Sequence, residues 1–267
     1  PSRRSARATR GTCTSFAIPI ATAPRDDPRF TVTASADTFL VAYADRTTVY
    51  GVRVRASDGV VLDPTPFVIS TYDGSSPDDL TAASDGSKFL VAWTDGRNRS
   101  ITQTGANPDV FMNLVSSTGT VSDRNGVPFA TGLDHQKGPV VVWNGSTYVI
   151  VFRHWSLSSA DVNELRARKV TASGSASGSA VTVATDGAFD LAVGGGRIAL
   201  VRGGGTSAQP GTIVASFLDA NLAAVGTQLV LGSNAYEVAG PYVAWNGSGF
   251  FVTWFTAPTV YEVEAQP

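Results

Sequence analysis

Short apolar runs recur along the chain at nearly regular intervals. Five of them can be aligned with one another, at residues 39–43, 89–93, 148–152, 197–201 and 250–254. Their last positions lie 50, 59, 49 and 53 residues apart. Apolar runs of this length, bounded by turn residues, are typical of buried β-strands. The spacing indicates a repeated unit of about four strands.

A tight turn precedes three of these runs. Residues 84–87, 143–146 and 245–248 each contain Asp-Gly or Asn-Gly. Such pairs supply the positive φ angles that a two-residue hairpin requires. Each unit is therefore predicted to begin with a short apolar strand and a turn, followed by the apolar run as its second strand.

Two more strands follow in the repeated unit. The copies of the third strand lie at residues 49–54, 110–115, 164–170, 212–217 and 260–263. Their polar alternation indicates a position nearer the rim of a sheet. A fourth strand occurs only four times, at residues 66–70, 127–131, 180–184 and 228–231.

The missing fifth copy lies at the other end of the chain. Residues 16–22 resemble residues 127–131 with two residues added. A linear solenoid has no use for such a displaced strand, whereas a ring gains by pairing its two ends, because this removes open sheet edges. Pro19, Pro66 and Pro128 suit an outermost strand, whose free side tolerates a missing N–H.

The chain is therefore predicted to be all-β, a five-bladed β-propeller of four-stranded antiparallel blades. The N-terminal strand is expected to close the ring by completing the C-terminal blade. Tandem β-sandwiches, a different blade count and a ring formed between chains are the alternatives. We expect a basic tail at 1–13 and one propeller domain at 14–267. Its expected blades span about 29–71, 78–131, 138–185, 188–232 and 239–264, with 16–22 added to the last.

Composition and charge narrow the possible partners. Apolar residues make up 43% of the chain and charged residues 16%, which is enough for a core and unlike a disordered chain. No run approaches the roughly 18 apolar residues of a membrane-spanning helix, so no transmembrane segment is expected. Four arginines in the first ten residues carry +4 of a net charge of −2, which leaves −6 for the remainder. An acidic body argues against nucleic-acid binding.

The beginning of the sequence and its cysteine bear on where the protein acts. The first residue is Pro1 and the single methionine is Met112, which would fit a cleaved leader. We therefore expect an exported protein, whether extracellular, periplasmic or at the cell surface. Cys13 is the only cysteine, so it can form no internal disulfide, and an intermolecular link is its candidate role.

Two of the repeated units share a polar signature after the apolar run. Residues 43–46 read Tyr-Ala-Asp-Arg and residues 93–97 read Trp-Thr-Asp-Gly-Arg, and a Ser-Asp-Gly turn follows at 57–59. In these features the chain resembles the Trp/Asp/Arg blade repeats of exported bacterial β-propellers. The fourth unit departs furthest, with Val201 in place of the aromatic residue. The resemblance implies a scaffold and no particular chemistry.

Candidate binding residues lie in the loops after the second and fourth strands, which share one face of a propeller. The long polar stretch at 94–109 is suited to a partner contact, because long loops without structure of their own are usually functional or disordered. An exposed Trp at 155 could stack on sugars or anchor a partner, although packing of His154 and Trp155 beneath the long loop is the preferred role. The candidates on this face are Arg97, Arg99, His135, His154, Trp155, Tyr236 and Glu237. For the Asp and Arg residues after the second strand, ordering of their own loop is the preferred role.

Catalytic and cofactor signals are weak in this sequence. His135 and His154 are the only histidines, both are expected in loops, and their spacing does not match a metal site. The glycine runs lack the helix and Lys-Ser/Thr of a phosphate-binding loop, and there is no Gly-x-Ser-x-Gly nucleophile turn. We therefore expect neither a cofactor nor a metal.

Two functions remain on the sequence alone. The preferred hypothesis is a non-catalytic binding module, not an enzyme, that presents loops to a protein partner in an assembly or to a glycan. The alternative is a glycoside-processing enzyme of the five-bladed type, which needs two carboxylates about 5 to 9.5 Å apart. Its candidates are Asp79 and Asp190 at the starts of first strands, and Glu237 in a loop.

Overall fold

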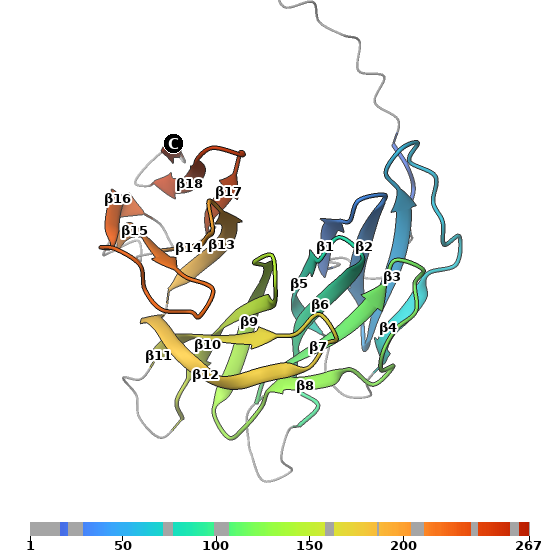
Figure 1. The fold of residues 1–267 in the computed structure, drawn as a ribbon. Helices are drawn as coiled ribbons and strands as arrows, with labels where there is room; N and C mark the ends of the chain where they lie inside the picture. The colour runs from blue at the N-terminus through green and yellow to red at the C-terminus, as the bar shows by residue number, and fades with distance from the viewer. Residues whose placement is uncertain are drawn as a thin grey trace, which may run out of the picture.

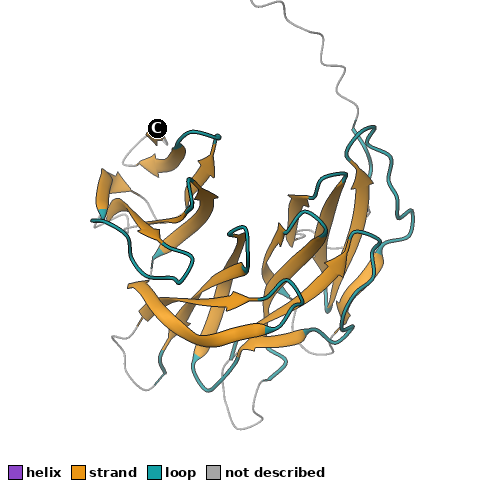
Figure 2. Cartoon of the chain, in the orientation of Figure 1, coloured by secondary structure: helices purple, strands orange, loops and turns teal. Residues whose placement is uncertain are grey.

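The fold consists of antiparallel strands joined by turns (Figures 1 and 2). A computed structural model describes residues 17–20, 29–71, 77–98, 107–157, 163–185, 187–203, 211–235, 240–256 and 262–266. Within these residues there are nineteen strands, and every pairing between them is antiparallel. None of the described segments is a helix with the length and apolar character needed to cross a membrane.

The strands form three four-stranded sheets and one seven-stranded sheet. We number them in chain order and describe the seven-stranded sheet as two parts, sheets 4 and 5. Sheet 1 contains β1 (Arg29–Ala34), β2 (Thr38–Asp45), β3 (Thr48–Arg55) and β4 (Phe67–Thr71). Sheet 2 contains β5 (Asp78–Ser84), β6 (Lys88–Asp95), β7 (Asp109–Ser116) and β8 (Val127–Ala130). Sheet 3 contains β9 (His135–Trp143), β10 (Tyr148–Trp155), β11 (Asn163–Val170) and β12 (Ala176–Thr185).

The last two sheets are joined by one backbone pairing. Sheet 4 contains β13 (Ala188–Gly194), β14 (Arg197–Gly203), β15 (Gly211–Leu218) and β16 (Leu229–Ala235). Sheet 5 contains β17 (Pro241–Trp245), β18 (Phe250–Thr256) and β19 (Glu262–Gln266). Ala235 of β16 pairs with Thr256 of β18 and links the two sheets. The four-stranded antiparallel sheets predicted from the sequence are thus confirmed.

The turns between first and second strands form as their sequences predict. Asp85, Asn144 and Asn246 each use the side-chain Oδ1 atom to accept hydrogen bonds from backbone N–H groups two and three residues later, at 2.7 to 3.0 Å. The glycine after each of them has a φ angle between 93° and 99°. Only glycine adopts this backbone conformation without strain, so these turns fix where each hairpin reverses.

Each middle strand is apolar at successive positions because both faces of its sheet are covered. On β6, Phe89 and Trp93 pack against sheet 1, while Leu90 packs against sheet 3. On β10, Ile150 faces sheet 2 and Val151 faces sheet 4. Strands covered on both faces read as continuous apolar runs. Burial of each such large side chain stabilises the fold by about 1.5–3 kcal/mol.

The first strands of the sheets lie next to one another around a common centre. β1 contacts β5, β5 contacts β9, β9 contacts β13, and β13 contacts β17. The sheets therefore radiate outward from these strands and follow an arc in Figure 1. This is the arrangement of a β-propeller.

The pairing of the two chain ends lies partly outside the described residues. Residues 17–20 form no strand. The side chain of Ile18 packs against Gly59, in the loop after β3: a Cβ atom added to Gly59 would lie 2.7 Å from Ile18 Cδ1. Phe30 on β1 is 67% exposed and Tyr242 on β17 is 54% exposed, so the first and last sheets each present an apolar side chain that ring closure could cover. Closure by residues 16–22 stays a prediction.

Candidate functional site

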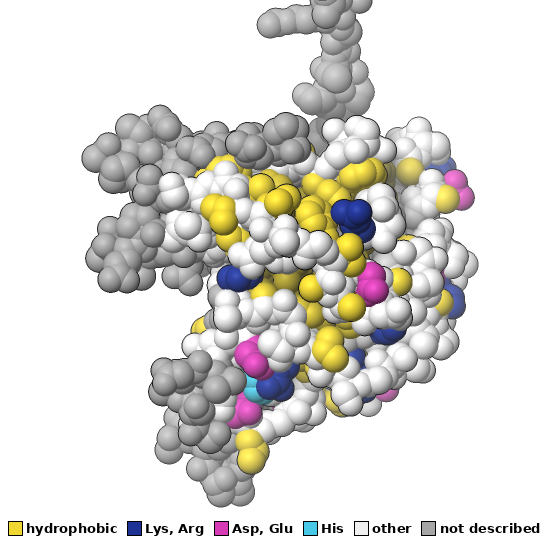
Figure 3. Space-filling view, turned by 60° about the vertical axis from the view of Figure 1, so that its left-hand side comes forward, with side chains coloured by type: hydrophobic (Ala, Val, Ile, Leu, Met, Phe, Trp, Pro, Cys, Tyr) yellow, Lys and Arg dark blue, Asp and Glu magenta, His cyan; other side chains and the backbone are white. Residues whose placement is uncertain are grey.

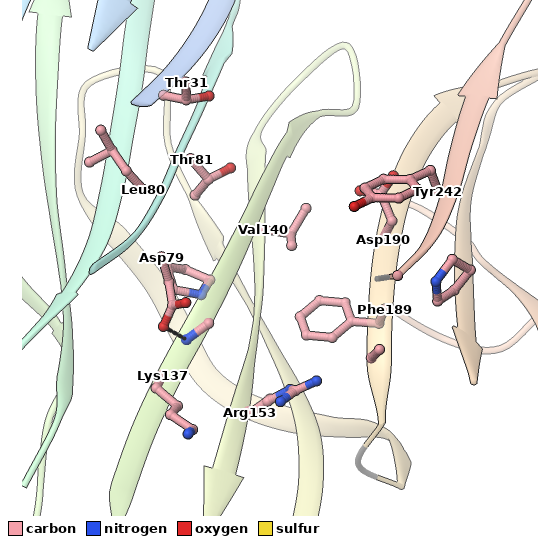
Figure 4. Close-up of a pocket in the computed structure, with 15 residues that line it drawn as sticks. Thr31, Asp79, Leu80, Thr81, Lys137, Val140, Arg153, Phe189, Asp190 and Tyr242 are labelled. Carbon is pink, nitrogen blue, oxygen red and sulfur yellow. Dashed lines mark hydrogen bonds between the residues drawn. The ribbon is translucent and has the colours of Figure 1, made fainter. Parts of the chain in front are cut away.

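All five sheets contribute to one cavity at the centre of the molecule. Its volume is about 600 Å³, and its walls come from the first strands β1, β5, β9, β13 and β17, together with Arg153 on β10 (Figure 4). Chemistry-bearing side chains on these walls include Asp79, Lys137, Arg153, Asp190 and Tyr242. We call this space the central cavity. A cavity of this size is typical of small-molecule sites.

Asp79 lies on β5 at an irregular point in the strand. The pairing of β5 with β6 shifts its register between Asp78 and Thr81, and Asp79 has a φ angle of 49°. Such bulges change the direction of a side chain, and strained backbone of this kind clusters at functional sites. Asp79 Oδ2 accepts hydrogen bonds from Thr94 Oγ1 and from the backbone N–H of Gly138, both at 3.1 Å. Strands β6 and β9 therefore hold this carboxylate at the cavity wall.

Asp190 lies on β13, on the other side of β9 from Asp79 (Figure 4). Its Oδ2 accepts a hydrogen bond from the backbone N–H of Val243 on β17, and its Oδ1 accepts one from Leu191, both at 2.9 Å. Burial raises the pKa of the Asp190 carboxyl above its usual range, although both hydrogen bonds act to lower it. The group therefore holds its proton to higher pH than an exposed aspartate does.

Two cations lie beside these acids. Lys137 on β9 and Arg153 on β10 are paired across the strands, so their side chains share one face of sheet 3. Lys137 Nζ lies 3.9 Å from the centroid of the Trp155 ring, and Arg153 Nη2 donates a hydrogen bond to the carbonyl of Gly187 at 2.9 Å. The central cavity thus brings both signs of charge together, which suits a polar, uncharged or mixed-charge substrate.

Aromatic rings complete the cavity wall on the side of sheets 4 and 5. Phe189 comes from β13 and the half-exposed Tyr242 comes from β17. In Figure 3 hydrophobic side chains gather in the middle of the visible face, and charged ones lie singly among them. A ring with an apolar face and a polar hydroxyl, as in Tyr242, is suited to contact both the C–H and the O–H groups of a sugar.

The Asp95–Arg97 pair orders its own loop, as the sequence predicts. Arg97 Nη2 lies 2.6 Å from Asp95 Oδ2, and the side chains of Arg97 and Asp95 are 11% and 0% exposed. The Arg97 guanidinium also lies over the Phe111 ring, 4.2 Å from its centroid. The structure therefore turns Arg97 inward against sheet 2, away from the central cavity.

The histidines lie on strands instead of the loops in which the sequence places them. His135 begins β9 opposite Trp155 at the end of β10, and His154 pairs with Gln136 one position further in. Because side chains alternate along a strand, the two imidazoles point to opposite faces of sheet 3. They therefore share no common site. β9 extends further than its sequence pattern indicates, because Gly138 with a φ angle of 62° and Pro139 interrupt the pattern without ending the strand.

The remaining sequence candidates fall in two groups. Arg99, Tyr236 and Glu237 lie outside the described residues. Asp79 and Asp190, named only for the alternative hypothesis, do line one cavity. Lys137 and Tyr242 were not predicted from the sequence. Both lie near the start of a first strand, as Asp79 and Asp190 do, and this shared position could have identified them.

The comparisons with known proteins support the fold. No protein-family model matches the chain, and no curated protein matches it in sequence. A GH43_1 enzyme from Xanthomonas citri, also solved in complex with xylotriose, has a TM-score of 0.53 at 8% identity, with 89–90% of this chain and 86% of that chain covered. An α-L-arabinofuranosidase from Lactobacillus brevis has a TM-score of 0.50 at 10% identity, with 90% and 89% covered.

These neighbours correct one expectation from the sequence. The matched propellers are enzymes, and this finding overturns the expectation that the chain is not an enzyme. The expectation of a non-catalytic module relied on the repeated Asp and Arg residues, which suit a scaffold. It overlooked that the acids on the first strands could meet in one cavity. At 8–10% identity the likeness shows the fold itself, so any activity has to be argued from the residues of the cavity.

Proposed function

We propose that this protein is a glycoside-processing enzyme whose reaction takes place in the central cavity. The observation that carries the proposal is the pair of carboxylates, Asp79 and Asp190, on two walls of one cavity. Hydrolysis of a glycosidic bond needs one carboxyl group that gives a proton and one carboxylate that assists the attack on the sugar. Their different environments assign one role to each.

Asp190 is the proton donor in this proposal. Burial keeps it protonated to higher pH, which is the property that a general acid requires. Its proton passes to the leaving oxygen as the bond from that oxygen to the anomeric carbon breaks. The leaving sugar then departs as a neutral alcohol.

Asp79 is the base that activates water. Its Oδ2 is held by the Thr94 hydroxyl and the Gly138 amide, both of which donate to a carboxylate. It removes a proton from the water as the water oxygen bonds to the anomeric carbon. β9 lies between β5 and β13, so the two acids stand on non-adjacent strands. This separation favours the wider carboxyl spacing of inverting enzymes over the narrow spacing of retaining ones.

The names of the matched structures suggest which glycosides to test first. One neighbour is an α-L-arabinofuranosidase and another was solved with xylotriose bound. Phe189 and Tyr242 offer aromatic surface against which a pentose ring can pack. We propose pentose-containing plant polysaccharides as the substrate class. Because such polymers lie outside cells, the proposal includes export of the protein, which cell fractionation tests.

The experiment is a hydrolysis assay on aryl α-L-arabinofuranosides, aryl β-D-xylosides, arabinan and xylo-oligosaccharides. Asp190→Asn and Asp79→Asn are each expected to lower kcat by about 10²–10⁴-fold. Asp37→Asn is the matched control, since Asp37 is exposed beside a turn of sheet 1. Proton NMR of the first product is expected to show inversion at the anomeric carbon. Absence of activity across the panel, or full activity in both variants, would refute the proposal.

A further inference from the structure

Thr94 lies near the end of β6, next to the Asp79 carboxylate but outside the lining of the central cavity. It pairs with Asp78 on β5, at the point where the register of β5 and β6 shifts. Thr94 is 5% exposed, whereas Asp79 is exposed and lines the cavity. A substrate in the cavity would therefore meet Asp79, and any part that the Thr94 hydroxyl takes in the reaction acts through this carboxylate.

The hydrogen bonds of the Thr94 hydroxyl determine where its proton points. The backbone N–H of Gly138 on β9 donates to Thr94 Oγ1 and to Asp79 Oδ2, both at 3.1 Å. Thr94 Oγ1 itself donates to Asp79 Oδ2 at 3.1 Å. A hydroxyl group has one proton to give, and of its two neighbours only the carboxylate can accept it. The Thr94 proton is therefore directed at Asp79 Oδ2.

The two oxygens of the Asp79 carboxylate have different surroundings. Oδ2 accepts both the Thr94 hydroxyl and the Gly138 N–H. Over the stretches of chain that the structure describes, Oδ1 accepts no hydrogen bond. Because Asp79 lines the central cavity, Oδ1 is the oxygen that remains for a water molecule there. A carboxylate anchored through one oxygen and open at the other is suited to act as a general base.

We propose that Thr94 is a positioning residue for the hydrolysis assigned to the central cavity, and this inference rests on that proposed function. Its hydroxyl holds Asp79 Oδ2, so that Oδ1 is the atom that takes a proton from the attacking water. The O–H bond of the water breaks as its oxygen bonds to the anomeric carbon. The leaving oxygen takes the proton of Asp190, and Thr94 keeps its own proton throughout.

The expected size of the effect follows from the geometry. A hydrogen bond to an ionised carboxylate is stronger than one between neutral groups, and this one is shielded from water because Thr94 is buried. Without it the Asp79 side chain is free to turn, and Oδ1 is less often directed at the water. A misplacement of about 1 Å can slow a reaction about 10²-fold. The loss should appear in kcat and not in KM, because Thr94 does not contact the sugar.

The test is the kinetics of Thr94→Val on an aryl glycoside that the wild-type protein cleaves. Valine keeps the branched shape and removes the hydroxyl, and the Gly138 N–H retains Asp79 Oδ2 as its acceptor. We expect kcat to fall by about 10–100-fold with KM unchanged. Thr94→Ser keeps the hydroxyl and should retain most of the wild-type kcat. Should Thr94→Val fail to fold, Thr94→Ala removes the same hydroxyl and takes its place.

A double-mutant cycle determines whether Thr94 acts through Asp79. In Asp79→Asn, which has already lost the carboxylate, adding Thr94→Val should lower kcat by less than about twofold. Ser122→Ala is the matched control, because Ser122 Oγ likewise accepts from a backbone N–H, that of Leu114 at 3.3 Å, and donates to a side-chain oxygen, Asn113 Oδ1 at 2.7 Å. Ser122 lies outside the cavity, so this variant should keep the wild-type kcat.

The possible results separate this inference from the proposed function. Absence of hydrolysis by the wild-type protein, or full activity in Asp79→Asn, would refute both. An active wild type and an impaired Asp79→Asn, together with a wild-type kcat in a folded Thr94→Val, would refute the positioning role alone. An equal loss of kcat when Thr94→Val is added to wild type and to Asp79→Asn would also refute it, because Thr94 would then act independently of Asp79.

Discussion

The Asp190 carboxylate accepts a hydrogen bond from the backbone N–H of Val243 at 2.9 Å and thereby joins sheet 4 to sheet 5 where their first strands meet. Asp79 and Gly138 make the equivalent contact between sheets 2 and 3 at 3.1 Å. In both cases an acid on one first strand binds the backbone of the next first strand. The proposed catalytic acids are therefore also contacts between sheets.

The first prediction concerns the pH dependence of hydrolysis. A general acid must be protonated, so kcat/KM should fall as the pH rises through the pKa of Asp190. Because burial raises that pKa, this basic limb should lie above the usual range of an aspartate. A pH profile on an aryl arabinofuranoside or xyloside measures it. A basic limb within the usual aspartate range would contradict the role assigned to Asp190.

The second prediction concerns the buried pair of Asp95 and Arg97. Asp95 accepts hydrogen bonds from Trp93 Nε1 at 2.8 Å and from Arg97 Nη2 at 2.6 Å. Asp95→Ala leaves a largely buried guanidinium without its carboxylate, so the free energy of unfolding should fall by about 3–5 kcal/mol. Urea unfolding followed by tryptophan fluorescence measures this loss.

The matched control for this prediction is an exposed pair. Arg55 and Asp58 lie 2.8 Å apart with side chains 46% and 45% exposed. Asp58→Ala should lower the free energy of unfolding far less than Asp95→Ala does, because solvent screens an exposed pair. If Asp95→Ala and Asp58→Ala lowered the free energy of unfolding by similar amounts, burial would not be what makes the Asp95–Arg97 pair strong.

The third prediction links stability to pH through Asp63. Burial acts to raise the pKa of Asp63, but hydrogen bonds from the Arg53 side chain and backbone, together with its charge, outweigh burial and lower it. A lowered folded-state pKa contributes stability above the usual aspartate pKa, and this contribution is lost as the pH falls through the folded-state value. Asp63→Asn should therefore cost about 2 kcal/mol at neutral pH and progressively less in acid.

Urea unfolding at several pH values checks the Asp63 prediction. The difference between wild type and Asp63→Asn should shrink as the pH is lowered below the usual aspartate range. Asp37→Asn serves as the control at an exposed position. A difference that stays constant with pH would mean that the ionised form of Asp63 is not what stabilises the fold.

The sheets could be predicted from the sequence because local patterns determine them. The continuous apolar run of β6 reports that both faces of its sheet are covered, and the Asx turns at Asp85 and Asn144 report where the hairpins reverse. Five such units gave the five sheets and the fold class. The extent of β9 was missed because Gly138 and Pro139 resemble loop residues, although the strand continues through them.

The central cavity was only partly predictable. The positions of Asp79 and Asp190 at the starts of first strands are visible in the repeat. The raised pKa of Asp190 could not be predicted, because it arises from burial in the folded protein. This surrounding structure includes residues far along the chain, such as Val243, 53 residues further on.

Asp79 and Asp190 join neighbouring sheets in addition to their proposed catalytic roles, and this combination has an evolutionary consequence. Selection for correct packing of neighbouring sheets would preserve Asp79 and Asp190 whether or not any substrate is cleaved, because each binds the backbone of a neighbouring strand. A descendant that gave up catalysis would still be expected to carry both residues. Among relatives of this protein, these acids should therefore outlast the proposed activity, and changes in the aromatic wall around Tyr242 should be the earlier sign of its loss.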